Sequence, residues 1–277
     1  MKPHRDREPA GPARPAAAPR FCVVMPAWNA AGTVDEAVGS VLAQTWAGWE
    51  LVIVDDGSTD TTGEVAERYA EGDRRITVLH QRNAGPAAAR NAGAGAGTAP
   101  FLLRLDADDV LLPACLATYA TFIAGHPGYD IYSCSAEVFS AAGVLSRYYE
   151  GERAGEVMEF TLDQMLDRNL ILGPAAVCTR AVFERVGGMR DGVYVEDYDF
   201  WLRALAAGAR HVFVPHVLVR YRLHPGQMSR DTVRMQASQA EVLETLAASG
   251  TLDAPLAARA RAAAAEARAA AEGEPAG

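Results

Sequence analysis

The chain has 277 residues, of which 49% are hydrophobic and 22% are charged. This length and composition suit one large α/β domain or two small ones. The formal net charge is −9, and because residues 1–20 carry +3, the remainder carries −12. A body this acidic lacks the basic surface that nucleic-acid binding needs, and it would repel a diphosphate unless a cation or local hydrogen-bond donors intervened.

The cysteines and the apolar runs set further limits on the class of protein. No C-x-x-C pair occurs, so the sequence predicts neither a zinc site nor a disulfide framework, and Cys22 and Cys134 are expected to be core thiols. No stretch reaches the ~20 apolar residues of a transmembrane helix, and no apolar signal core follows the N-terminus. We therefore expect a cytoplasmic enzyme without a transmembrane segment, for which peripheral contact with a membrane stays open. The four cysteines are Cys22, Cys115, Cys134 and Cys178.

The first half of the chain alternates short apolar runs with helical segments. Residues 1–20 are rich in proline and arginine, which predicts a disordered tail. After them, continuous apolar runs predict strands buried on both faces, and the alternation predicts a parallel sheet with helices on both sides. Thr33 and Glu36 form a capping-box pattern for the first helix, and Asp60 is expected to cap the second. The predicted strands cover residues 21–25, 50–54, 76–79 and 101–105, and the third helix begins at Pro86.

The second half of the chain is more mixed. Two strands are predicted to pair around Gly143, and Thr179 is expected to cap a helix that ends near Val186. From about Thr232 the sequence is Ala-rich and helical, although the composition of its last segment is also typical of a solvated helix. The remaining predictions are strands at 130–140, 144–149, 175–178, 211–214 and 217–221, helices at 162–169 and 196–207, and breaks at Ser249-Gly250 and near Pro255.

Polar residues follow each predicted strand of the first half. Because ligands bind at the carboxyl ends of parallel strands, we expect these residues to meet at one edge of the sheet. They are Trp28-Asn29, Asp55-Asp56, Arg82-Asn83 and Asp106 to Asp109.

Three carboxylates among four residues end the fourth predicted strand: Asp106, Asp108 and Asp109. Crowded like charges are costly unless a cation offsets them, and hard carboxylate oxygens suit Mg²⁺ or Mn²⁺, which in turn bind substrate phosphates. A single aspartate would more simply cap a helix, and Asp109 could cap one that starts near Pro113. Three of them after a buried strand favour the metal.

Two other segments are weaker indications of a ligand site. Asp55-Asp56-Gly57 is a common turn pattern, although a carboxylate at a strand end can also accept hydrogen bonds from a ribose or a base. Gln81 to Asn91 opens a helix whose free N–H groups suit an anion, with Arg82 and Arg90 nearby. No P-loop and no G-x-G-x-x-G pattern is present.

Later in the chain, Glu196 and Asp197 begin a predicted helix. Acidic residues are common there because of the helix dipole, but a carboxylate can also act as a general base on an acceptor hydroxyl, which contributes roughly 10²–10⁴ in rate. His224 follows a strand, and the segment favours equally a metal or phosphate contact and an ordinary surface histidine. His211 and His216 are expected to be structural.

In this order the motifs resemble glycosyltransferase family two, the inverting nucleotide-diphospho-sugar transferases with the GT-A fold. Each motif alone is moderately specific, whereas seven in order over residues 21–230 are highly specific. The matching segments are residues 24–29, 40–45, 51–59, 83–91, 105–109, 196–197 and 221–229.

The resemblance implies an α/β fold of the GT-A type, a Rossmann-like, mostly parallel sheet flanked by helices. The implied organisation is a transferase domain over residues 21–231, with a nucleotide-sugar half (21–109) and a mixed acceptor half (110–231), followed by an Ala-rich helical tail (232–277). The implied partners are a nucleotide-sugar donor, expected to be UDP-linked, and an acceptor that is a sugar, a lipid-linked group or a small molecule. The implied cofactor is Mg²⁺ or Mn²⁺.

The resemblance also implies a role for each matching residue. Trp28 stands where the family usually has Tyr beside the base, and Asp56 matches the carboxylate that contacts the base. Asp197 matches the catalytic base, with Glu196 in support. For the metal, Asp108 is expected to be the direct ligand, with Asp106 nearer the ribose and His224 as a late contact. The implied nucleotide-sugar site is Pro26, Ala27, Trp28, Asn29, Asp55, Asp56, Asn83, Gly85, Arg90, Asp106 and Ala107.

Three alternative functions can be weighed against this sequence: a processive synthase, a nucleotidyltransferase and a binding protein without catalysis. The chain lacks the Q-x-x-R-W segment and the membrane spans of processive synthases, which favours a single-transfer enzyme. A sugar-1-phosphate nucleotidyltransferase would need a basic, Gly-rich loop where Pro26 to Asn29 stand, and pyrophosphate release would identify it. A nucleotide-sugar-binding protein without catalysis is disfavoured by Asp197 and by the Asp106/Asp108 pair.

Overall fold

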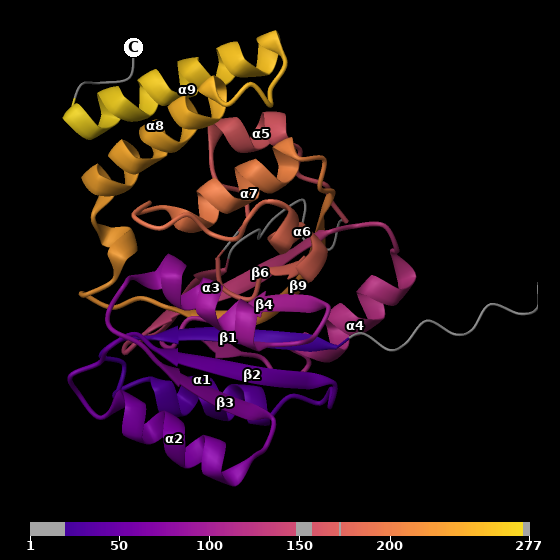
Figure 1. Cartoon of the computed structure of the whole chain (residues 1–277), viewed down its shortest axis with the longest axis vertical. Coiled ribbons are helices and arrows are strands. Elements are labelled where there is room, and N and C mark those ends of the chain that lie inside the picture. Colours follow the sequence, from indigo (N-terminus) through magenta and orange to yellow (C-terminus); the bar gives the residue numbers. More distant parts are fainter. Residues whose placement is uncertain (1–19, 148–156, 172, 274–277) are drawn as a thin grey trace, which may run out of the picture.

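The computed structural model describes residues 20–147, 157–171 and 173–273, so most of the predicted N-terminal tail lies outside the described residues. The four strands of the first half are parallel and adjacent, in the order β3-β2-β1-β4 (Figure 1). All four were predicted within two residues at each end. They are β1 (Phe21–Ala27), β2 (Trp49–Asp55), β3 (Ile76–His80) and β4 (Phe101–Arg104), connected through α1 (Val34–Leu42), α2 (Thr62–Gly72) and α3 (Pro86–Ala96).

The second half extends the same sheet in the order β4-β8-β6-β9-β5, and β8 is antiparallel to both of its neighbours. As predicted, two strands pair around Gly143, and Thr179 caps a helix by accepting a hydrogen bond from Val182 N. The elements are β5 (Val110–Leu111), α4 (Cys115–Gly125), β6 (Ile131–Ser140), β7 (Gly143–Arg147), α5 (Leu162–Asp167), β8 (Val177–Thr179), α6 (Arg180–Arg185), α7 (Glu196–Ala206), β9 (His211–Arg222) and the 3₁₀ helix η1 (Met228–Arg230).

The prediction of two short strands at 211–214 and 217–221 was wrong, because β9 is one long strand beside β6. Its register shifts where Cys134 opposes Val214 and Ser135 opposes Val217, so that Pro215 and the residue after it have no partner in the ladder. A proline cannot donate to a ladder, and a bulge accommodates it without ending the strand.

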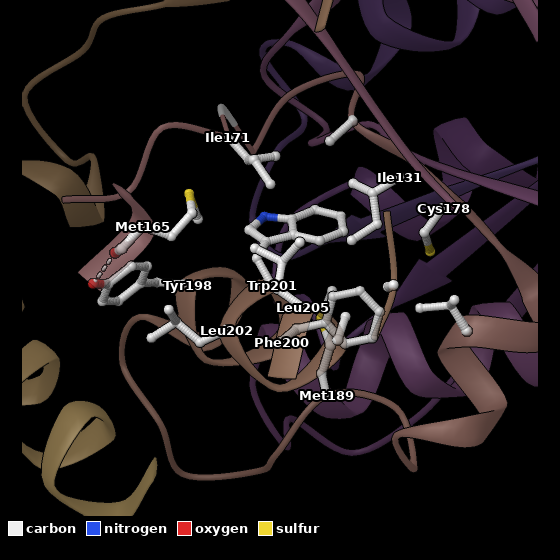
Figure 2. Close-up of a cluster of buried hydrophobic side chains, with 14 of the residues drawn as sticks. Ile131, Met165, Ile171, Cys178, Met189, Tyr198, Phe200, Trp201, Leu202 and Leu205 are labelled. Carbon is white, nitrogen blue, oxygen red and sulfur yellow. Dashed lines mark hydrogen bonds between the residues drawn. The ribbon is translucent and has the colours of Figure 1, made fainter. Parts of the chain in front are cut away.

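Each face of the sheet is covered by its own hydrophobic core. On β1, Phe21, Val23 and Met25 face one core, which α1, α2 and α4 complete, and Cys22 and Val24 face the other. This alternation follows from the two-residue period of a strand. The second core centres on Trp201 of α7 (Figure 2). Because both faces are buried, the strands read in sequence as continuous apolar runs.

The Ala-rich C-terminal segment forms two helices, α8 (Thr232–Ala248) and α9 (Ala254–Glu272), with the predicted break between them. Figure 1 shows them as a hairpin at the end of the molecule opposite α2. The helix α9 is not simply solvated, since it buries Ala257, Ala260 and Ala264 and its Arg259 pairs with Asp167 of α5 at 2.7 Å. Among the described residues, none of the helices is both long and apolar enough to cross a membrane.

Two of the predicted helix caps differ in the structure. The capping box at Thr33 is absent, because its hydroxyl donates to Ala30 O and Glu36 pairs instead with Arg222. The N-cap position of α2 is Thr61, whose side chain makes no capping hydrogen bond, and the predicted Asp60 carboxylate accepts from Thr62 N and Oγ1 from one position earlier. Only at Thr33 did a tertiary partner replace the expected local one.

We expect Gly93→Ala to destabilise the fold, because α3 packs directly on the sheet at this residue. A Cβ on Gly93 would lie 2.6 Å from Val24 Cγ1 and 3.2 Å from Val54 Cγ2. Overpacking of this kind costs about 1–3 kcal/mol. The matched control is Gly95→Ala in the same helix, where a Cβ meets nothing within 4 Å and alanine should stabilise by about 0.5–1 kcal/mol. Urea unfolding measures both, and equal effects at the two glycines would contradict the proposed packing.

Candidate active site

The polar residues at the strand ends lie along one edge of the sheet. Asp56 N donates to Ala27 O, and Leu105 N donates to Val24 O, which joins the ends of β2, β1 and β4 in that order. Neighbouring strands are about 4.8 Å apart, so the backbones near Asp56 and Asp106 are separated by roughly 10 Å. The structure therefore brings together the residues that the sequence analysis expected at this edge.

The loop after β1 presents an aromatic face at this edge. Trp28 is 58% exposed, and the loop behind it is fixed by hydrogen bonds to the loop after β2. Asn29 has a positive φ of 49°, its amide oxygen accepts from Thr59 N at 2.8 Å, and its own N–H donates to Ser58 Oγ at 3.0 Å. Pro26 and Ala27 belong to the end of β1. This arrangement leaves the Trp28 ring open for stacking.

Asp56 organises the turn that leads into α3. Its side chain is buried, Oδ1 accepts from Gln81 Nε2 at 2.7 Å and Ala84 N at 2.9 Å, and Oδ2 accepts from Gly85 N at 2.8 Å. Two N–H groups of the turn just before α3, those of Ala84 and Gly85, are therefore bound by a carboxylate. Asn83 on the same turn is exposed.

Asp55 lies behind the turn and contacts a histidine. Its carboxylate accepts from Ser58 N at 3.0 Å and lies 3.0 Å from His80 Nδ1, while His80 Nε2 lies 2.8 Å from Glu67. Burial acts against ionisation of Asp55, but the hydrogen bonds from Ser58 and His80 outweigh it and lower its pKa. Glu67 first, and Asp55 second, raise the pKa of His80.

Asp108 pairs with His224, as the resemblance implied for two residues of one site. Its Oδ2 lies 3.0 Å from His224 Nε2. Burial, and then the charge of Asp106, raise the pKa of Asp108, and the contact with His224 opposes that shift. The ionised form of this carboxylate is therefore under-compensated, which a cation would relieve.

Asp109 does not cap a helix. The helix α4 begins at Cys115 with Ala114 at its cap, and the Asp109 side chain is fully buried and accepts from Arg222 N at 2.9 Å. Burial, and then the neighbouring Asp108, raise its pKa well above the usual range. Arg222 also donates to Asp108 O at 2.7 Å, so the end of β9, and with it His224, is held against the acidic loop.

The donor set fits a divalent cation that takes few ligands from the protein. Among residues 20–147, 157–171 and 173–273, no three His, Cys, Asp or Glu side chains are arranged to hold a metal. Asp106 bonds to Arg90 and does not join Asp108 and His224. Mg²⁺ characteristically binds through one or two carboxylates plus substrate phosphates, and Asp108 offers such a carboxylate.

A buried arginine links the acidic loop to the start of α7. Arg90 of α3 donates from Nη2 to Asp106 Oδ1 at 2.5 Å and from Nη1 to Glu196 Oε1. Burial opposes ionisation of Asp106, but Arg90 and Arg104 outweigh it and lower its pKa. For Glu196 burial prevails over Arg90, and its pKa is raised. Two segments 90 residues apart thus share one cation.

Asp197 lies beside this network with part of its side chain, 22%, in contact with solvent. Its Oδ1 accepts from Tyr198 N at 2.7 Å, and Oδ2 lies 3.5 Å from Asn169 Nδ2 and 3.6 Å from Arg104 Nη1. The buried apolar side of α7, around Trp201, fixes the helix and with it the direction of its first turn (Figure 2). Asp197 is therefore anchored but accessible.

Sequence reasoning missed four side chains that build this site: Gln81, Arg104, Asn169 and Arg222. Arg104 offered a usable signal, since it is a charged residue inside a buried strand and lies two positions before Asp106, on the same face. Gln81 and Arg222 lie within segments that the sequence analysis singled out, but their contacts, like those of Asn169, depend on tertiary structure and could not be predicted.

We expect the stability contribution of His80 to depend on pH. Its pKa is raised above the unfolded value of about 6.5, so its contribution is fully present below that value and is lost as the pH rises through the folded-state pKa. The difference in unfolding free energy between the wild type and His80→Gln should therefore be largest in acid and shrink toward pH 8, as measured by urea unfolding across pH. Glu67→Gln should lower the His80 titration midpoint in NMR spectra. A stability difference that grows with rising pH would contradict this prediction.

Comparisons with known proteins agree on one family. The model of glycosyl transferase family 2 matches residues 22–186. The succinoglycan biosynthesis protein ExoU of Rhizobium meliloti (strain 1021) is 33% identical over 213 residues, which are 72% of this chain and 61% of that protein. An uncharacterized glycosyltransferase of Haemophilus influenzae is 27% identical over 222 residues, which are 76% of this chain and 68% of that protein.

Solved structures share the fold. S. aureus TarS 1-349 in complex with UDP-GlcNAc superimposes with a TM-score of 0.73 at 20% identity, covering 91% of this chain and 73% of that one. The mannosyltransferase PcManGT from Pyrobaculum calidifontis, in complex with GDP-Man and Mn²⁺, gives 0.68 at 22% identity, covering 95% and 77%. The expected GT-A architecture is thereby confirmed. With its matching segment, its fold and its relatives, the chain belongs to glycosyl transferase family 2 and is a glycosyltransferase.

Proposed function

We propose that this protein is an inverting glycosyltransferase that transfers a sugar from a UDP-linked donor to an acceptor hydroxyl, with Asp197 as the general base. One observation carries the proposal: the strand-end carboxylate Asp106 and the helix-start carboxylates Glu196 and Asp197 meet through buried arginines at one edge of the sheet. Transfer requires the donor and the acceptor to be bound side by side, and polar side chains from separate segments that converge at one place can bind both.

On the donor side, the open Trp28 ring is suited to stacking on the base. Trp28 follows β1, and the acidic loop follows β4, the strand directly beside β1. Asp108 and His224 would hold a divalent cation, Mg²⁺ or Mn²⁺, which supplies charge neutralisation for a leaving diphosphate. Support for the uracil base comes from the fold shared with TarS, which was solved with UDP-GlcNAc. The GDP-Man complex of PcManGT makes guanine the alternative to test.

On the acceptor side, Asp197 takes the proton from the acceptor hydroxyl as its oxygen attacks the anomeric carbon. The bond from that carbon to the diphosphate oxygen breaks at the opposite face, so the configuration inverts and no covalent enzyme intermediate forms. Asn169 Nδ2 lies beside Asp197 Oδ2, and the partial exposure of this carboxylate admits the acceptor. Glu196 pairs with Arg90 and supports the first turn of α7.

We expect Asp197→Asn to abolish transfer and leave donor binding intact, because the amide keeps the shape of the carboxylate but cannot accept the proton. A general base contributes roughly 10²–10⁴ in rate, so kcat should fall by at least about 100-fold. Release of nucleotide from the best of a panel of UDP- and GDP-sugars measures kcat, and calorimetry with UDP measures binding. Near-normal turnover in this variant would refute the assignment of the base.

Asp108→Ala should remove the part of UDP affinity that depends on Mn²⁺. In the wild type, UDP at 100 times its Kd should add about 2.7 kcal/mol to the free energy of unfolding, and chelation with EDTA should reverse most of that gain. The control is Asp191→Ala, an exposed aspartate outside the site, which should behave like the wild type. If EDTA reverses the UDP stabilisation of Asp108→Ala as fully as that of the wild type, or if EDTA has no effect on the wild type, the metal role is rejected. Stabilisation by GDP but not by UDP would reject the uracil base.

A further inference from the structure

Arg104 is a buried cation that the proposed chemistry leaves without an obvious task. Only 9% of its side chain is exposed, and it lies 3.6 Å from Glu196 Oε1 through Nη2 and 3.6 Å from Asp197 Oδ2 through Nη1. Within the described part of the chain, its Nε and Nη1 have no hydrogen-bond partner. A buried donor without a partner costs about 1–3 kcal/mol, so the fold keeps Arg104 in this place at a cost in stability.

The ion pairs around Arg104 show which carboxylate depends on its charge. Glu196 is already bonded to Arg90, and Asp106 shares that same arginine at 2.5 Å. Asp197 has no other cation among the ion pairs of the described residues, so Arg104 is the positive charge opposite it. The second arginine thus extends the network from the donor side of the site to the acceptor side.

The backbone fixes Arg104 firmly in this place. Arg104 N donates to Ala176 O at 3.0 Å, and its carbonyl accepts from Ala175 N at 2.9 Å. Ala175 has a positive φ of 57°, a conformation that costs a residue with a side chain roughly 1–2 kcal/mol, and Tyr119 Oη holds its carbonyl at 2.8 Å. Strain of this kind persists where the surrounding structure over-determines it, and such places cluster at functional sites.

Gly173 leaves room for the contact between Arg104 and Asp197. A Cβ on Gly173 would lie 3.2 Å from Asp197 Oδ2 and 3.4 Å from Arg104 Nη2. A methyl group here would press on both charged groups at once. The close approach of the backbone therefore defines the position of the carboxylate as well as that of the guanidinium.

We propose that Arg104 is a positioning residue for Asp197, holding the carboxylate at the acceptor side of the site through a charge contact that is long enough to let it move. The inference rests on the proposed function, in which Asp197 is the base. A loose pair of 3.6 Å anchors Asp197 without occupying Oδ2, which stays available for the acceptor proton, while Oδ1 accepts from Tyr198 N. Arg104 itself does not contact the substrate in this role.

Arg104→Met, which keeps the length of the stem and removes the charge, should lower kcat by about 100-fold, the size of effect that a misplaced catalytic group produces. The Kd for UDP should not change. Arg104→Lys should recover most of the lost kcat, since the contact is one of charge and uses no bidentate hydrogen bonds. In the Asp197→Asn background, Arg104→Met should cause no further loss, because both changes act through the same carboxylate.

Two further variants keep the test interpretable. Gly173→Ala should lower kcat with UDP binding intact, and it tests the contact even if Arg104→Met does not fold. Arg180→Met is the control for loss of a half-buried arginine, because Arg180 bonds to the backbone carbonyls of Ala94 and Ala99 and should affect stability without affecting kcat.

An unchanged kcat in Arg104→Met or in Gly173→Ala would overturn the role of Arg104, as would an equal further loss in the Asp197→Asn background. If Asp197→Asn itself keeps its turnover, the proposed base is wrong, and that result is independent of any Arg104 variant. The two hypotheses therefore fail separately.

Discussion

The burial of the Arg90 guanidinium is the interaction on which the rest of this site depends. A charge in the interior must be paired, and removing one partner of such a pair costs about 3–5 kcal/mol. Arg90 takes its partners from two distant parts of the chain, Asp106 after β4 and Glu196 at the start of α7. The two halves of the domain, which we propose bind the donor and the acceptor, are consequently tied together at the point where both present carboxylates. Neither loop can move far without leaving the arginine unpaired.

The acids of the site form two groups, according to whether an arginine compensates their charge. Asp106 is compensated by arginine, and its pKa is lowered. Asp108 and Asp109 belong to the same loop, and for both of them burial, and then the charge of an earlier aspartate in the loop, raises the pKa. The demand for positive charge is therefore concentrated at Asp108, beside His224. In an acidic protein that must bind a diphosphate, this distribution supports the proposal that a cation and the substrate phosphates are bound together there.

The sequence predicted the elements better than the contacts between them. Strands such as 50–54 were recognisable because both faces are buried, and the location of Asp56 and Asp106 at one edge followed from parallel topology. Thr33 and Glu36 matched a local capping rule, yet Glu36 bonds to Arg222, 186 residues away. Predictions from local patterns fail where a distant partner competes, and the pairing of Arg90 with Glu196, 106 residues apart, is of the same kind.

The two sides of the site also differ in how tightly they are built. Asp56 accepts three hydrogen bonds of 2.7 to 2.9 Å, so the turn before α3 is preorganised, and in the proposed donor site this carboxylate acts chiefly by shaping that turn. Asp197, in contrast, accepts one short hydrogen bond, from Tyr198 N to Oδ1 at 2.7 Å, whereas its Oδ2 has only Asn169 and Arg104 at 3.5 and 3.6 Å. In the proposed mechanism a rigid donor side fixes where the anomeric carbon lies, whereas the base must approach a hydroxyl and receive its proton, which needs freedom to shift by a fraction of an ångström. The short bonds of Asp56 suit the first role, and the long contacts of Asp197 Oδ2 suit the second.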